Sequence, residues 1–164
     1  MALSKIQSES INLADDFAGM GFGGTTTANQ LDDYEEGTWT ATLKGSSSDP
    51  TTAVTITAHY TKVGQIVTAH GTFGNISTVG ASGAVRVAGL PFTANGTQAC
   101  GNVMTHTRYA LSTNASNMSP YIGGNGTQIH FYQSLNTSGW AEISHSAGGS
   151  AGYLYFSVTY RTAQ

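Results

Sequence analysis

The stretch 53-AVTITAHYTKVGQIVTAHGTF-73 decides the predicted fold, because apolar and polar residues alternate on both sides of a glycine. An alternation of period two is typical of half-buried strands, so the stretch predicts a hairpin. A two-residue type II′ turn at Gly64-Gln65 places His59 opposite His70 on the outer face. A turn at Val63-Gly64 would separate the two histidines, but valine is poorly suited to positive φ. The inner face then comprises Val54, Ile56, Ala58 and Tyr60 in the first strand and Val67, Ala69, Gly71 and Phe73 in the second.

Similar segments recur from Gly37 to the C-terminus, separated by Gly, Asn and Ser. They are TWTATLK (38–44), AVRVAGLPF (84–92), NVMTHTRYAL (102–111), QIHFYQS (128–134), AEISH (141–145) and GYLYFSVTYRT (152–162). Asn-Gly pairs within ANGT (94–97) and GNGT (124–127) indicate type I′ hairpin turns, because both central residues of such a turn take positive φ. These segments predict about eight or nine strands in an antiparallel, all-β sandwich or jelly roll.

The composition supports a folded β domain and excludes several classes of protein. Charged residues make up 9% of the chain, against about 25% in a typical globular protein. The hydrophobic share of 39%, with eight Tyr and six Phe, argues against a disordered chain. Cys100 is the only cysteine, so neither an intrachain disulfide nor a zinc site of paired cysteines is expected.

A step in charge marks the predicted domain boundary. Residues 1–36 hold seven acidic residues and one lysine, whereas residues 37–164 hold five basic and two acidic residues. We therefore expect an irregular N-terminal arm with a Gly/Thr-rich connector over residues 1–30, and the β domain over residues 31–164. The five basic residues are scattered singly, which argues against nucleic-acid binding. No apolar run reaches the roughly 20 residues of a membrane span, and none resembles a signal peptide.

Four motifs carry a resemblance to a known family. They are LDDYEEGTWTATL (31–43), YTKVGQIVTAHGTF (60–73), GLPF (89–92) and FSVTYRTA (156–163). In that order they resemble bacteriophage fibre and fibre-like virion proteins, in which a variable segment precedes an L-D-D-Y-E-E-G-T-W stretch and a β-rich C-terminal domain. The positions that match this junction motif are Leu31, Asp32, Asp33, Tyr34, Glu35, Glu36, Gly37, Thr38 and Trp39.

The resemblance implies a virion structural protein without enzymatic activity, assembled in the host cytoplasm as a homotrimer. It implies a short fibre or fibre-tip component whose arm binds other virion proteins and whose β domain faces the host. The apolar residues predicted to anchor the arm are Leu3, Ile6, Ile11, Leu13 and Phe17. The alternative is a capsid decoration or cement protein, in which the same β domain stabilises the shell.

The acidic cluster of the junction has three chemical interpretations. It could supply the carboxylate pair of a glycosidase, or it could bind calcium through its carboxylates. We favour a structural junction, in which Asp32 and Asp33 bond backbone N–H groups of a turn and Glu35 and Glu36 lie before the first strand. Trp39 then packs into the core at the start of that strand.

Other candidate sites come from the histidines and the aromatic residues. His59 and His70 are the best pair for a metal ion, but two imidazoles are too few for a closed site, so neither a metal nor another cofactor is expected. The glycine-rich GMGFGG (19–24) lacks the Lys and Ser/Thr of a phosphate-binding loop. Aromatic rings stack on sugar faces, which makes surface aromatics beside Asn and Ser candidates for binding host glycans. These candidates are Tyr109, Tyr121, Trp140 and Tyr153.

Overall fold

The structure is a computed structural model that describes residues 20–21, 30–31, 34–107, 109, 111–145 and 152–163. The five predicted arm anchors (Leu3, Ile6, Ile11, Leu13 and Phe17) and the carboxylates Asp32 and Asp33 lie outside these residues. Every regular element in the described part of the chain is a strand, which confirms the all-β prediction. No stretch of it forms an apolar helix long enough to cross a bilayer.

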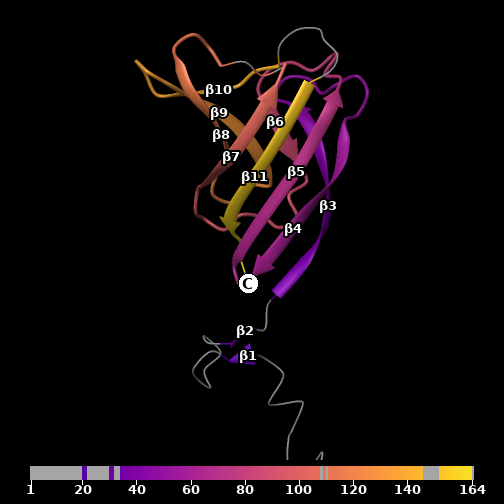
Figure 1. Cartoon of the computed structure of the whole chain (residues 1–164), viewed down its shortest axis with the longest axis vertical. Coiled ribbons are helices and arrows are strands. Elements are labelled where there is room, and N and C mark those ends of the chain that lie inside the picture. Colours follow the sequence, from indigo (N-terminus) through magenta and orange to yellow (C-terminus); the bar gives the residue numbers. More distant parts are fainter. Residues whose placement is uncertain are drawn as a thin grey trace, which may run out of the picture.

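The described strands form two sheets (Figure 1). The smaller sheet pairs β1 (Met20–Gly21) with β2 (Gln30–Leu31). The strands of the larger sheet are β3 (Tyr34–Gly45), β4 (Thr55–Val63), β5 (Ile66–Ile76), β6 (Val85–Ala88), β7 (Ala99–His106), β8 (Ala115–Ile122), β9 (Gln128–Leu135), β10 (Trp140–Glu142) and β11 (Gly152–Arg161). All pairs are antiparallel.

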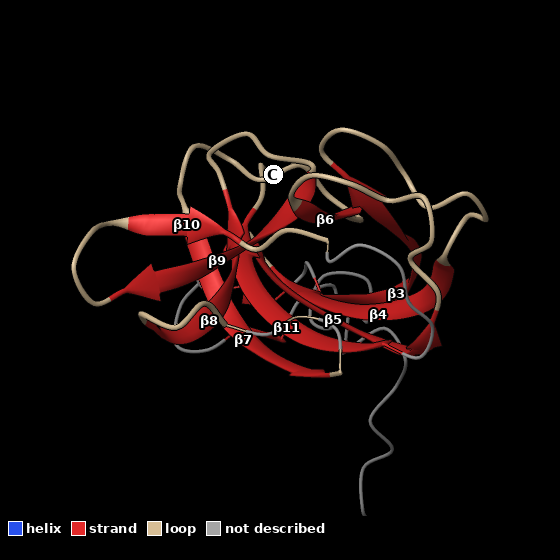
Figure 2. Cartoon of the chain, turned by 90° about the horizontal axis from the view of Figure 1, so that it is seen from above, coloured by secondary structure: helices blue, strands red, loops and turns tan. Residues whose placement is uncertain are grey.

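The larger sheet closes on itself as a barrel of eight strands, so the predicted sandwich or jelly roll is wrong. The strands follow the order β9-β6-β3-β4-β5-β11-β7-β8, and β8 pairs with β9 to complete the circle. Strand β10 adds to the free side of β9 beyond the end of β6 (Figure 2). The alternation of apolar and polar residues is the same in a sandwich and a barrel, because both bury one face of each strand.

Strand β8, which closes the barrel, is the one strand of the barrel with no counterpart among the predicted segments. Its sequence, ASNMSPYI, contains Asn, Pro and two Ser. Asn and Pro are depleted in strands, and Ser is not among the residues that favour them. Pro120 is tolerated because the pairing of β8 with β7 ends at Tyr121. No residue of β7 therefore requires a hydrogen bond from the backbone nitrogen of Pro120, which carries no hydrogen. Tertiary contacts with β9 therefore override the local preference of this segment.

The predicted hairpin has the expected register. His59 pairs with His70 and Val63 with Ile66, which leaves Gly64 and Gln65 as the turn residues, and Gly64 has φ +56°. This pairing confirms the turn at Gly64-Gln65 and the shared outer face of the two histidines. Positive φ at the first turn position costs glycine little, because it has no Cβ to clash with the backbone.

The two predicted type I′ turns are wrong. Only Gly96 of the first Asn-Gly pair and only Asn125 of the second have positive φ. The two loops contact each other instead, because the Gly96 N–H donates to Asn125 Oδ1 at 3.2 Å and the Ala94 N–H donates to the Gly126 carbonyl at 3.0 Å. Contacts between loops that are distant in sequence therefore decide these conformations.

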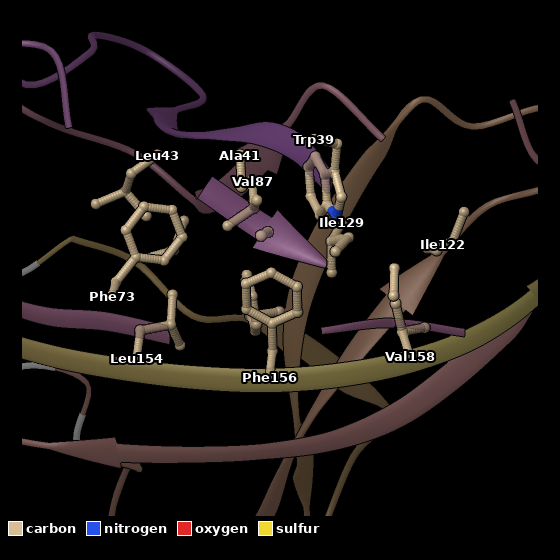
Figure 3. Close-up of a cluster of buried hydrophobic side chains, with 14 of the residues drawn as sticks. Trp39, Ala41, Leu43, Phe73, Val87, Ile122, Ile129, Leu154, Phe156 and Val158 are labelled. Carbon is tan, nitrogen blue, oxygen red and sulfur yellow. The ribbon is translucent and has the colours of Figure 1, made fainter. Parts of the chain in front are cut away.

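The barrel interior is filled by side chains that meet at the ring of Phe156 (Figure 3). This ring lies 6.4 Å, centroid to centroid, from each of Trp39, Phe73 and Phe131. The residues paired with Phe156 and with Trp39 on the intervening strands are Gly71 and Ala58, respectively. These small residues leave the space in which the large rings of β3 and β11 meet.

We predict that Gly71→Ala destabilises the barrel, by about 1–3 kcal/mol for an overpacked core. A Cβ at position 71 would lie 2.7 Å from Cζ of Phe156, whose ring is held by three other aromatic rings. The matched control is Gly74→Ala on the same strand, where the nearest atoms lie 3.9 Å away and no loss is expected. Urea denaturation of both variants measures the difference, and equal stability would contradict this account of the core.

Candidate functional site

The candidate site is a cluster of three aromatic side chains on the outer wall of the barrel. Tyr121 lies on β8, Tyr132 on β9 and Trp140 at the start of β10. Alternation along β9 turns Ile129 and Phe131 into the core, so Tyr132, the residue after Phe131, faces outward. The pairing of β9 with β8 and β10 carries Tyr121 and Trp140 to the same face.

The three rings contact one another without lying in one plane. The ring centroids of Tyr121 and Tyr132 are 5.4 Å apart, and Trp140 lies 6.4 Å from each of them. The interplanar angles range from 50° to 82°, so the rings form a corner. Trp140 is 71% exposed, which leaves most of its indole open to a ligand.

A hollow of about 300 Å³ lies beside this corner, where β7 and β8 separate. The two strands share only two residue pairs, Ala99 with Ile122 and Cys100 with Tyr121. The hollow is lined by Gln98, Ala99, Cys100, Ser119, Pro120, Tyr121, Tyr132, Ser134 and Trp140. Its size lies at the lower end of the range for small-molecule sites, which is about 300–1,000 Å³.

Charged groups lie next to the aromatic corner but pair with one another. Oε1 of Glu142 lies 3.7 Å from Nη2 of Arg86 and 3.2 Å from Nδ1 of His130. Burial, and then the negative charge of Glu142, raises the pKa of the Tyr132 phenol. A hydrogen bond to Glu142 contributes to the same shift of the pKa, so the protonated Tyr132 hydroxyl acts as a donor towards that carboxylate.

The structure brings together two of the four predicted glycan-binding residues, Tyr121 and Trp140. Tyr109 is only 5% exposed and lies in the core beside His145, so its ring face is not open to a ligand. Tyr153 lies on a different wall, against His106 and Tyr155. Tyr132 was not among the predicted residues, although the alternation in QIHFYQS turns it away from the core, opposite to the buried Phe131.

The outer wall formed by β3, β4, β5, β11 and β7 has a different character, because its central residues carry no formal charge. Met104 is exposed there by 62% and lines a hollow with Tyr153 and Tyr155. We call the central part of this surface the uncharged wall, and its outward residues are Thr38, Thr40, Thr57, His59, Thr61, Thr68, His70, Thr72, Asn102, Met104, Tyr153, Tyr155, Ser157 and Thr159. The charged residues Glu36, Lys44 and Arg161 lie towards the ends of the same strands, and Glu36 borders His59 and His70.

The predicted metal pair lies on the uncharged wall. The imidazoles of His59 and His70 stack with centroids 5.6 Å apart and an interplanar angle of 21°. In the part of the chain that the structure describes, His, Cys, Asp and Glu side chains form no group of three or more that could hold a metal ion.

Tyr34, Glu35 and Glu36 of the junction motif are the first three residues of β3, so the prediction that both glutamates precede the first strand is wrong. Each carboxylate accepts a hydrogen bond from a tyrosine: Tyr60 donates to Glu35, and Tyr34 donates to Glu36 at 3.0 Å. Gly37 is needed beside Tyr60, because a Cβ there would lie 2.8 Å from the Tyr60 hydroxyl. Trp39 packs in the core as predicted, but it is the sixth residue of the strand.

The comparisons with known proteins identify no family: the chain matches no family model, and no curated protein sequence is significantly similar to it.

We predict that Trp39→Ala lowers the free energy of unfolding by about 3–5 kcal/mol, because it leaves a cavity among the core rings. The matched change in the same strand is Glu36→Gln, which keeps an oxygen that accepts the Tyr34 hydroxyl and should melt like the parent. Thermal melts of both variants check the prediction. An unchanged melting temperature for Trp39→Ala would contradict a structural role for the junction.

Proposed function

We propose that this chain is a non-enzymatic phage virion protein, a short fibre or fibre-tip component that binds host surface glycans through Tyr121, Tyr132 and Trp140. The observation that carries the glycan-binding part is the exposed aromatic corner beside a hollow of about 300 Å³. The virion part rests on the motifs of residues 31–43 and 60–73, which resemble phage fibre proteins.

The chemistry of the hollow suits a sugar. Aromatic faces pack against the C–H groups of a pyranose, and neutral side chains bond its hydroxyls. The hollow offers both, because Gln98, Ser119 and Ser134 line it together with the three rings. Trp140 is 71% exposed and lies in a cluster with Tyr121 and Tyr132, and a contiguous exposed apolar patch is a mark of a binding surface.

The same surface favours binding over hydrolysis. A glycosidase holds two carboxyl groups about 5–9.5 Å apart across the scissile bond. The lining of the hollow contains no carboxylate, and the adjacent Glu142 is engaged by Arg86 and His130. The carboxylates Glu35 and Glu36 belong to β3, which pairs with β4 and β6 and not with the strands that carry the aromatic corner.

The uncharged wall supports the proposed homotrimer. Depletion of charged residues is the compositional mark of a buried interface core, and Tyr and Met are enriched there. This wall spans five adjacent strands and carries two outward Tyr and the exposed Met104. Association through it would leave the aromatic corner, on β8, β9 and β10, open to the host.

We expect Trp140→Ala to weaken binding to host glycans at least tenfold, about 1.4 kcal/mol, because it removes the most exposed ring of the corner. The control is Val79→Ala, which shortens an exposed apolar side chain in the loop between β5 and β6, outside both the aromatic corner and the uncharged wall, and should leave affinity unchanged. Glycan arrays followed by titration of the hits measure both variants. Unchanged binding in Trp140→Ala would place the site elsewhere.

We expect light scattering to return three times the 17.0 kDa mass of the chain. Thr57→Glu places a charge in the uncharged wall and should shift the mass towards the monomer, because an unpaired charge is costly to bury. Thr52→Glu, in the exposed loop between β3 and β4, is the matched control and should remain trimeric. A monomeric parent at micromolar concentration would contradict the trimer.

Particle reconstruction distinguishes the fibre from the capsid alternative. Copies at the tail or at a fibre tip are expected for a protein that binds the host surface. Copies spread over the capsid lattice would favour the decoration or cement protein and would contradict the fibre assignment.

A further inference from the structure

We infer that the ligand of the aromatic hollow is an uncharged glycan, built from neutral hexoses or N-acetylhexosamines, and not a sialylated, uronic or phosphorylated one. This inference rests on the proposed glycan-binding function and names the chemical class that the site selects. It follows from the lining of the hollow, from the state of the neighbouring charges and from the arrangement of the rings.

The lining offers only neutral partners. Its polar groups are the Gln98 amide, the hydroxyls of Ser119 and Ser134, and the two phenols. Such groups both donate to and accept from sugar hydroxyls. A carboxylate or phosphate placed in the hollow would lose hydration without gaining a cation, and burial of an unpaired charge is strongly unfavourable.

The neighbouring cation does not change this conclusion, because Arg86 is already compensated. Its Nη2 lies 3.7 Å from Oε1 of Glu142, and an anionic ligand would have to compete with that carboxylate. The Nε atom of Arg86 makes no hydrogen bond, but it is buried beneath the wall and out of reach of a ligand at the surface. Glu142 would also repel an anion directly.

The remaining described cations are engaged elsewhere. Lys44 pairs with Asp49 at 2.6 Å, Lys62 lies above the ring of Phe92 at 5.8 Å, and Arg161 donates to Gln65. None of them lines the hollow.

The ring geometry favours one or two sugar units. Because the rings are inclined by 50° to 82°, a pyranose can lie parallel to one of them and meets the others at their edges. Trp140 offers the open face, whereas Tyr121 and Tyr132 are half-buried. A volume of about 300 Å³ limits the ligand to a short segment of an oligosaccharide.

Cys100 provides a direct probe, because it is the only cysteine of the chain, is exposed and lines the hollow. The experiment measures the rate at which iodoacetamide alkylates Cys100 in the full chain. It is run with neutral oligosaccharides (lactose and chitotriose) and with acidic ones (sialyllactose and oligogalacturonate), each at low and high salt. Mass spectrometry reports the extent of alkylation.

We expect a neutral oligosaccharide to slow alkylation about tenfold when its free concentration is ten times its dissociation constant, because the free fraction of protein is then about a tenth. Protection should be the same at both salt concentrations, since no ion pair contributes. Trp140→Ala should lose the protection and Trp140→Phe should keep most of it. The acidic oligosaccharides should leave the rate unchanged.

Two results would overturn the inference, and they differ in what else they overturn. Protection by the acidic oligosaccharides, or protection that fades with salt, would contradict a neutral ligand and leave glycan binding standing. Protection by neither class, in agreement with a negative glycan array, would contradict the proposed function and this inference with it. The melting temperature of Trp140→Ala is measured as well. If it equals that of the parent, the loss of protection in this variant is not caused by unfolding.

Discussion

The packing of Phe156 at the centre of the barrel is the contact on which the rest of the structure depends. Its ring meets those of Trp39, Phe73 and Phe131, which come from three other strands around the barrel. A barrel of eight strands has an interior just wide enough for side chains, so large residues must face small ones. Gly71, which pairs with Phe156, supplies that space.

Because side chains fill the interior of the barrel, the candidate ligand site lies on its outer surface. The hollow arises where β7 leaves β8 after two residue pairs, beside Pro120. Proline cannot donate to a ladder, so the two strands have no reason to stay paired past this point. The residue that ends the pairing therefore also helps to make room for the candidate ligand.

The two sides of the barrel have different proposed roles, which are association with other copies of the chain and glycan binding. The central parts of strands β3, β4, β5, β11 and β7 present Thr, Ser and His without formal charge, which suits contact with further copies of the chain. Strands β8, β9 and β10 present the aromatic corner and its neutral hollow, which suits a glycan. Each strand serves both the core and its own wall, because successive side chains point to opposite faces.

The sequence by itself determined the local features, which are the all-β class, the pairing of His59 with His70 and the inward side chain of Trp39. Alternation and turn chemistry specify these features because they act within a few residues. Only the tertiary structure decided that one sheet closes as a barrel, that β8 is a strand, that Tyr109 is buried and that Tyr132 joins Tyr121 and Trp140. Alternation tells which face of a strand is buried, but it does not tell which distant strand lies beside it, since that choice depends on how the core side chains fit together.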